Sequence, residues 1–215
     1  MLKPEISQQH LIVFTRYPEV NRTKTRLIPL LGAEGAANLQ RQMTEHTISQ
    51  VAQLSASTIV SSEVRFAGGN LQLMQTWLGA NLLYTPQGEG DLGERMMRSL
   101  NESFDSGAKK VIIIGTDCPD IDSELLQTAF ERLNEFDLVL GPAIDGGYYL
   151  IGLRRFAPEL FSNIDWGTSQ VFQQTIDIAQ ILKLSSFYLP PLADIDRPED
   201  LKIWEEARKR GKGKG

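Results

Sequence analysis

Short apolar runs alternate with amphipathic segments along most of the chain, a pattern typical of βαβ units around a mostly parallel sheet. The run 111–114 consists of four β-branched residues, as expected for a parallel strand buried on both faces. The predicted strands are 10–15, 57–66, 81–84, 111–114, 137–140, 147–153 and 186–189. The predicted helices are 33–54, 71–78, 92–104, 123–133 and 169–182, with a final helix that opens at Pro198. We therefore expect an α/β fold in which helices flank a mostly parallel central sheet.

Composition places the chain among ordinary globular proteins. It has 215 residues, of which 41% are hydrophobic and 23% charged, values that suit one domain of intermediate size. The net charge is -5 and the body carries no basic stripe, so a nucleic-acid partner is not expected. The one basic cluster, 208–215, is terminal and rich in glycine, and we expect it to form a flexible tail.

Counts of cysteine and histidine argue against several kinds of site. Cys118 is the only cysteine, which excludes an intramolecular disulfide and a thiolate-rich metal site and suits a cytoplasmic location. His10 and His46 are the only histidines and lie far apart, so neither a zinc site nor a Ser-His-Asp triad is expected. No apolar run approaches the ~20 residues needed to cross a bilayer, and no membrane partner is expected.

Two aspartates follow the 111–114 strand in a turn. Gly115 and Pro119 end the strand, which places Asp117 just beyond its carboxyl end. Ligands of open α/β sheets bind at that edge, where a carboxylate can hold Mg²⁺ or Mn²⁺ against a diphosphate. The alternative for the neighbouring Asp120 and Asp122 is that they cap the following helix.

A loop with four cationic side chains leaves the first strand. Arg16, Arg22, Lys24 and Arg26 can surround a diphosphate, because arginine offers a planar fork to phosphate oxygens and lysine a compact charge. The alternative is a solvated basic loop, since the segment lacks a glycine-rich phosphate cradle.

Two further acidic segments are candidates for the same edge of the sheet. Asp145 precedes two glycines that let a ligand approach the backbone, and it can act as a general base; the same dipeptide also signals a tight hairpin turn, and both readings are compatible. Asp194 and Asp196 alternate on an extended segment, which puts both carboxylates on one face. Asp196 can complete a metal shell with Asp117, or it can cap the last helix.

Taken together, several of these stretches resemble one bacterial family. The segments FTRYPEVNRTKTRL, GEGDLGERM, GTDCPD, GPAIDGGYYLIGL and DIDRPEDL are similar to those of small GT-A-type nucleotide-diphospho-sugar transferases, once grouped as a domain of unknown function. Members occur near radical-SAM enzymes and have a proposed role in arsenosugar synthesis. The resemblance covers nearly the whole chain and implies a single GT-A Rossmann-like catalytic domain over 1–207, with a nucleotide-activated sugar as donor.

The resemblance also implies roles for individual residues. Asp117 looks like the GT-A metal aspartate, Lys24 and Arg26 look like phosphate ligands, and Asp145 falls in the Asp-Gly-Gly motif. The stretch with Gly90, Asp91 and Gly93 looks like the loop that meets the nucleotide base or the acceptor, and Thr116 is a further nucleotide candidate. The chain departs from the family at Val20-Asn21, where a glycine is frequent; asparagine tolerates the positive φ of such a turn.

Three functions remain open from the sequence. The first is a metal-dependent glycosyl transfer to a small-molecule acceptor, in which charge stabilisation of the departing diphosphate is the larger effect. The second is nucleotidyl transfer from a nucleoside triphosphate, as in enzymes that guanylylate phospholactate or phosphoenolpyruvate, although a Gly-x-Gly-x-Arg loop is missing after the first strand. The third is a nucleotide-binding partner protein without catalysis, and a homodimer is compatible with each.

Overall fold

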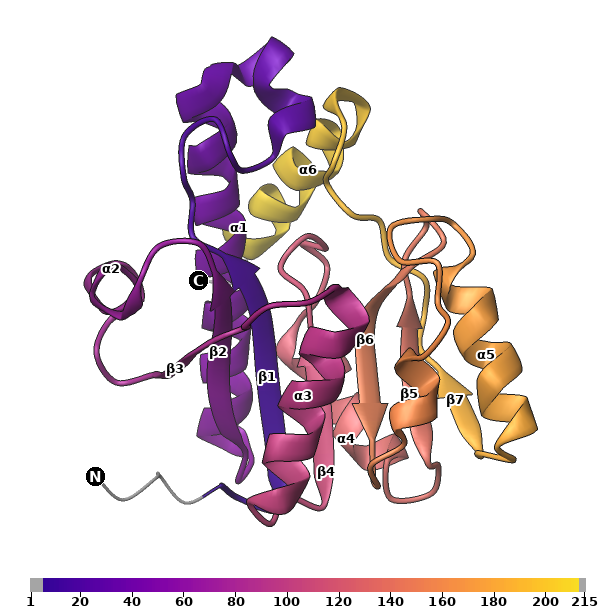
Figure 1. Cartoon of the computed structure of the whole chain (residues 1–215). Coiled ribbons are helices and arrows are strands. Elements are labelled where there is room, and N and C mark those ends of the chain that lie inside the picture. The colour runs from indigo at the N-terminus through magenta and orange to yellow at the C-terminus, as the bar shows by residue number, and fades with distance from the viewer. Residues whose placement is uncertain (1–5, 213–215) are drawn as a thin grey trace.

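One seven-stranded sheet organises the molecule (Figure 1). The computed structural model describes residues 6–212. The strands are β1 (Gln9–Arg16), β2 (Ser61–Ala67), β3 (Leu83–Pro86), β4 (Lys110–Ile114), β5 (Leu138–Pro142), β6 (Tyr148–Leu153) and β7 (Ser186–Tyr188). Their order across the sheet is β3-β2-β1-β4-β6-β5-β7, and only β6 runs antiparallel to its neighbours. The expected mostly parallel sheet is therefore confirmed.

Helices cover both faces of the sheet. The α-helices are α1 (Ile28–Ser57), α2 (Leu71–Leu78), α3 (Leu92–Asp105), α4 (Ser123–Arg132), α5 (Val171–Ile181) and α6 (Leu201–Lys212). Three short 3-10 helices are η1 (Thr25–Leu27), η2 (Pro158–Phe161) and η3 (Pro198–Asp200). In Figure 1, α3 and α5 lie in front of the sheet, with α1 and α4 behind it. Within the described residues, none of these helices is long and apolar enough to span a bilayer.

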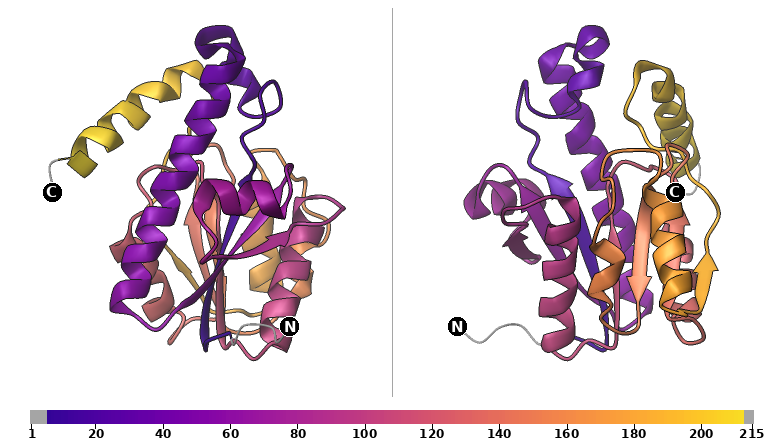
Figure 2. Two further views of the ribbon diagram at one scale, coloured as in Figure 1. Left: turned by 90° about the vertical axis from the view of Figure 1, so that its left-hand side faces the viewer. Right: turned by 45° about the vertical axis from the view of Figure 1, so that its right-hand side comes forward.

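Three apolar clusters hold these layers together. One joins α1, α2 and α4 to one sheet face, and a second joins α3, α5 and η2 to the other. The third is smaller and lies beyond the carboxyl edge of the sheet, where the first half of α1 and helix α6 rise above the strands (Figure 2). We call it the upper cluster, and its buried members are Leu27, Ala36, Leu39, Met43, Ile195 and Trp204.

Most predicted elements have the predicted type, with shifted ends. Helix α1 includes a first turn at Ile28 that was not predicted, and the non-helical Gly32, with φ of +70°, separates this turn from the long helix expected from 33 onward. Strand β2 begins at Ser61 and not at 57, since α1 continues through Ser57. Helix α6 continues through Arg208 to Lys212, residues that the sequence analysis placed in a flexible tail; 213–215 lie outside the described residues.

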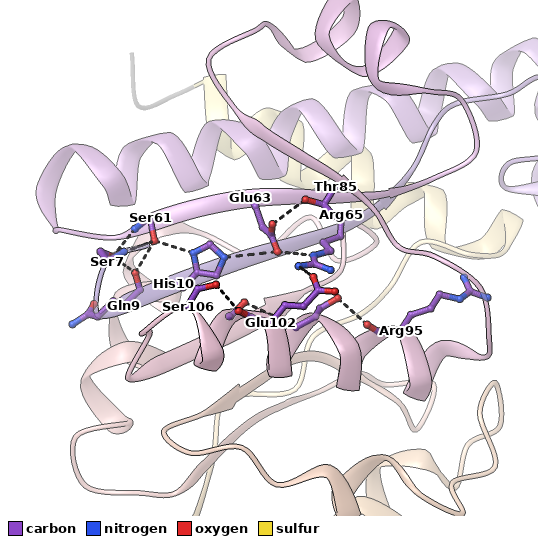
Figure 3. Close-up of polar contacts among 12 residues, drawn as sticks. Ser7, Gln9, His10, Ser61, Glu63, Arg65, Thr85, Arg95, Glu102 and Ser106 are labelled. Carbon is purple, nitrogen blue, oxygen red and sulfur yellow. Dashed lines mark hydrogen bonds and ion pairs between the residues drawn. The ribbon is translucent and has the colours of Figure 1, made fainter. Parts of the chain in front are cut away.

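A buried polar network lies between β1, β2 and α3 (Figure 3). His10 Nδ1 lies 2.8 Å from Ser61 Oγ, and its Nε2 lies 3.8 Å from Glu63 Oε1. Arg65 binds both Glu63 and Glu102 of α3, at 2.6 and 2.7 Å. Burial alone would raise the pKa of Glu63, but the neighbouring His10 and Arg65 outweigh burial and hold that pKa below its usual value.

Candidate active site

A cleft of about 710 Å³ opens at the carboxyl ends of β1 and β4, a size typical of small-molecule sites. The fold creates it because the loops that follow β1, β4 and β5 leave the sheet at one edge. Its charged lining residues are Arg16, Arg22, Lys24, Arg26, Arg95, Asp117, Asp145, Asp194 and Asp196. The structure therefore brings together the cationic loop and all three predicted acidic segments, which are distant in sequence.

The cationic loop is held in shape by its own polar contacts. Asn21 and Lys24 have φ of +67° and +48°, so asparagine does adopt the left-handed turn that the sequence analysis allowed at this position. Thr23 Oγ1 donates to the Glu19 carbonyl at 2.6 Å, and Glu19 Oε1 accepts from the Gly69 backbone N–H at 2.9 Å. These contacts fix the base of the loop against the end of β2.

Two of the loop cations are engaged by cleft carboxylates. Lys24 Nζ lies 2.8 Å from Asp117 Oδ1 and also donates to the Ile195 carbonyl, and only 4% of its side chain is exposed. Arg26 Nη1 contacts Asp196 Oδ2. Among the described residues, Arg16 has no carboxylate partner, and Arg22 pairs only with Glu19 of the same loop.

Thr116 belongs to a buried hydroxyl and amide cluster at the floor of the cleft. Gln40 Nε2 donates to Thr116 Oγ1 and to Thr44 Oγ1, each at 3.2 Å, and the Thr15 and Thr44 hydroxyls are 2.9 Å apart. Sequence patterns did not indicate Gln40, since a glutamine in a helix has no signature of its own. The cluster couples α1 to the ends of β1 and β4 beneath Asp117.

Asp145 lies in the connection between β5 and β6 and is exposed to the cleft. Its Oδ1 accepts from the Gly147 N–H at 2.8 Å, and Gly146 has φ of +93°. The tight Asp-Gly turn is therefore confirmed, and it orients the carboxylate at the cleft. A turn role and a chemical role for Asp145 are compatible, as the sequence had left open.

Asp194 adds a fourth carboxylate that the alternating pattern had placed on one face with Asp196. It is half-buried, and burial together with the charges of Asp145, Asp117 and Asp196 raises its pKa. Burial also raises the pKa of the Cys118 thiol, with Asp117 adding to the effect. Both effects favour the protonated thiol over the nucleophilic thiolate.

Carboxylate oxygens are the donors that Mg²⁺ and Mn²⁺ prefer, and in this respect the four aspartates fit a divalent metal. Besides burial, the charges of the other three aspartates raise the pKa of Asp194, and a bound cation would relieve this repulsion. Among residues 6–212, however, no three such side chains are already gathered around a common metal position. Asp117 and Asp196, the predicted ligands, instead each contact a loop cation.

The glycine-rich stretch before α3 contributes differently from expectation. Gly90, Asp91 and Gly93 do not line the cleft, whereas Leu92 and Arg95 do. Asp91 caps α3: its Oδ1 accepts from the Glu94 N–H at 2.9 Å, and Glu94 accepts from the Asp91 N–H in return. Gly93 packs against the Trp166 indole, where a Cβ would come within 2.5 Å of Nε1.

The remaining acidic positions have structural contacts. Asp122 caps α4 by accepting from the Leu125 N–H at 2.8 Å, which confirms the helix-cap reading for that residue. Asp120 instead contacts Arg210 of α6. The helix-cap reading of Asp196 is wrong, because Arg197 holds the N-cap position of η3 and Asp200 accepts from its N–H at 2.7 Å.

Residues 50–168, more than half of the chain, match the model of a family described as uncharacterized protein conserved in bacteria (DUF2064). The chain belongs to this family. No protein of curated function matches it by sequence.

Several solved structures are similar to this chain. A structure from Desulfovibrio desulfuricans G20, whose proposed activity is nucleotide-diphospho-sugar transfer, shares 34% identity over 89% of this chain and 84% of that one, with a TM-score of 0.81. The inositol-1-phosphate CTP transferase from T. maritima is 14% identical over 95% of this chain and 97% of that one, with a TM-score of 0.60. Glucosyl-3-phosphoglycerate synthase from Mycobacterium tuberculosis, solved with Mn²⁺ and UDP, is 16% identical over 93% and 76%, with a TM-score of 0.51. The two more distant likenesses establish the GT-A-like, Rossmann-like fold.

Proposed function

We propose that this protein is a metal-dependent glycosyltransferase that takes a nucleotide-diphospho-sugar as donor and a small molecule as acceptor. The observation that carries the proposal is the cleft, where four cations between the end of β1 and η1 share the lining with four aspartates at the carboxyl edge of the sheet. Such a pairing of charges suits a diphosphate bound together with a divalent cation. The proposed activity of the relative from Desulfovibrio desulfuricans G20 supports the same class.

The loop cations have the clearest role in this reaction. Arg16, Arg22 and Arg26 are exposed at the cleft and can bind the oxygens of a diphosphate. Lys24, whose side chain is buried beside Asp117, can bind the same oxygens from the protein side. Cationic groups fixed before the reaction stabilise the charge that builds up on a departing nucleoside diphosphate. Asp117 and Asp196 would hold Mg²⁺ or Mn²⁺, which would supply further neutralisation of that charge.

Asp145 is the candidate general base. The Gly147 N–H orients its carboxylate, and Gly146, whose positive φ and close approach to Ser169 leave no room for a side chain, holds the turn that carries it. A carboxylate in that position can accept the proton of an acceptor hydroxyl as the glycosidic bond forms. The proton then rests on Asp145 until solvent removes it.

Nucleotidyl transfer is the alternative, because the same charged groups can bind a triphosphate. Arg95 is the observation in favour of this alternative, because it is a cation on α3, outside the loop, that can bind a further phosphate group. The CTP transferase from T. maritima shares the fold, which does not itself choose between the two reactions. A nucleotide-binding protein without catalysis is the third possibility.

A ligand screen tests these alternatives. We would measure thermal stability and binding heat with UDP, GDP, ADP and CDP, with their triphosphates, and with their sugar conjugates, each with and without Mn²⁺. Preference for a diphosphate or sugar nucleotide with Mn²⁺ supports glycosyl transfer, whereas preference for a triphosphate supports nucleotidyl transfer. Absence of any binding overturns the proposal.

Variants then locate the site and identify the reaction. Asp117→Asn is expected to abolish the Mn²⁺-dependent part of nucleotide binding. Asp105→Asn is the matched control, since Asp105 ends α3 about 15 Å along the helix from Arg95, the α3 residue of the cleft nearest to it. Release of nucleoside diphosphate from a sugar nucleotide identifies glycosyl transfer, and release of pyrophosphate identifies nucleotidyl transfer. Tight binding without either product favours a non-catalytic role.

A further inference from the structure

Both predicted metal ligands are paired with cations from the same loop. Lys24 Nζ lies 2.8 Å from Asp117 Oδ1, and Arg26 contacts Asp196. The other two cleft aspartates, Asp145 and Asp194, have no cation partner among the described residues. The loop thus supplies a counter-ion to each of the two carboxylates that the proposed function assigns to the metal, and supplies none to the other two.

The position of Lys24 makes this pairing competitive with metal binding. Its side chain is 4% exposed while that of Asp117 is 53% exposed, so the ammonium approaches the carboxylate from the protein side. The Ile195 carbonyl accepts a second hydrogen bond from Nζ and so holds the ammonium in place. A divalent cation that binds Asp117 must share or displace this charge.

We infer that Lys24 and Arg26 are counter-ions that keep the metal carboxylates neutralised until a metal and a diphosphate arrive together. This inference rests on the proposed function. When both ligands bind, each loop cation exchanges a carboxylate for a phosphate oxygen, and each carboxylate exchanges a loop cation for the metal. Charge stays balanced throughout, whereas either ligand alone leaves like charges unpaired. Metal and diphosphate therefore bind with strong positive coupling, and metal alone binds weakly.

Backbone contacts allow the exchange to occur through side chains alone. The Ile195 N–H donates to the Asp117 carbonyl at 2.9 Å, which fixes the acidic segment to the turn after β4. Leu27 and Ile195 meet in the upper cluster, so the loop and the acidic segment are already docked to one another. The long, flexible side chains of Lys24 and Arg26 can then change partners without moving either segment.

Mn²⁺ titrations in the presence and absence of inorganic pyrophosphate test the inference. Pyrophosphate stands for the diphosphate whatever the nucleotide base, and bound Mn²⁺ is measured by electron paramagnetic resonance. The wild-type protein is expected to bind Mn²⁺ at least tenfold more tightly with saturating pyrophosphate. Lys24→Met is expected to bind Mn²⁺ alone at least tenfold more tightly than wild type, and to lose most of the gain from pyrophosphate.

Lys183→Met is the matched control. Lys183 also has a positive φ, +54° against +48° for Lys24, but it is exposed and does not line the cleft. Its replacement should leave Mn²⁺ binding unchanged. An effect seen only in Lys24→Met then comes from the lost charge in the cleft and not from methionine at a positive φ. Arg26→Met provides a second test if Lys24→Met does not fold, because the Arg26 side chain is 65% exposed and supports no core.

Two outcomes would overturn the inference and leave the transferase proposal standing. One is unchanged or weaker binding of Mn²⁺ alone in both Lys24→Met and Arg26→Met. The other is wild-type protein that binds Mn²⁺ and pyrophosphate independently of each other. A wild-type protein that binds neither pyrophosphate nor any nucleotide would instead remove the proposed function, and the inference with it.

Discussion

Arg65 donates from Nε to Glu63 Oε1 at 2.6 Å, and both side chains, two positions apart on β2, are 4% exposed. Residues at this spacing in a strand point to the same face, here the face covered by α3 (Figure 3). Thr85 donates to the other oxygen of Glu63 at 3.2 Å, and Arg65 reaches Glu102. Each buried charge therefore has a partner, which is the condition under which such a pair is tolerated.

Removal of Arg65 is expected to be strongly destabilising. Arg65→Met leaves the Glu63 carboxylate buried without its main partner, and we expect a loss of about 3–5 kcal/mol in the free energy of unfolding. Glu102→Gln is the control: because Glu102 is 46% exposed, its loss should cost at most about 1 kcal/mol. Urea unfolding measures both. Equal costs for the two variants would show that the buried pair has no special weight.

Stability at acidic pH should depend on Asp137. Burial by itself would raise the pKa of Asp137, but the Ser185 N–H, the Ser185 hydroxyl and Arg154 outweigh it and lower this pKa from 3.8 to about 2. Because the folded pKa is the lower one, the stabilisation is present above about pH 4 and is lost as the pH falls through 2.

Asp137→Asn is therefore expected to lower the free energy of unfolding by about 1–2 kcal/mol at pH 6, through weakened hydrogen bonds. The difference from wild type should narrow steadily below pH 4. Asp177→Asn, an exposed position on α5, should differ little from wild type at any pH. Urea unfolding at pH 6, 4, 3 and 2.5 follows the difference, and a constant gap would contradict the assignment.

Two glycines with the same φ separate backbone strain from steric conflict. Gly79 and Gly146 both have φ of +93°, but a Cβ at Gly79 meets nothing within 4 Å, whereas one at Gly146 lies 2.3 Å from the Ser169 carbonyl oxygen. Gly79→Ala should cost about 1–3 kcal/mol from strain alone. Gly146→Ala should cost a further 1–3 kcal/mol, roughly, from the clash. Thermal unfolding compares the two, and similar losses would mean that the turn relaxes around Ser169.

Asp91 is expected to act through the helix that it caps. Asp91→Ala should lower the free energy of unfolding by about 1 kcal/mol, and Asp91→Ser should recover most of the loss because serine also caps. Nucleotide affinity should change less than twofold in both variants, since Asp91 does not line the cleft. Should affinity fall in Asp91→Ser although stability is kept, the residue would have the ligand role implied by the family resemblance.

Local patterns in the sequence predicted more of the fold than of the site. The β-branched run that forms β4, the cap at Asp122 and the Asp-Gly turn at Asp145 depend on neighbouring residues, and all three were predictable. Strand β3 begins at Leu83 because its register follows Glu63 of β2, and such pairing is not encoded locally.

Long-range contacts account for what the sequence did not reveal at the cleft. The sequence indicated that Lys24 and Asp117 belong to the same edge of the sheet. It could not show that Lys24 is buried against the Ile195 carbonyl, or that Gln40 reaches Thr116. These contacts form only when the cationic loop packs on the acidic segment and α1 packs against the end of β4. The short distance between Lys24 and Asp117 is likewise a product of that packing.

The upper cluster gives the two charged sides of the cleft a common foundation. Leu27 adjoins Arg26 and Ile195 separates Asp194 from Asp196, and both apolar side chains belong to the same cluster as Trp204 of α6. The packing of these apolar side chains thus helps to set the spacing between the loop cations and the aspartates. A smaller side chain at Trp204 is therefore expected to shift the loop cations relative to the aspartates, although no residue of α6 lines the cleft.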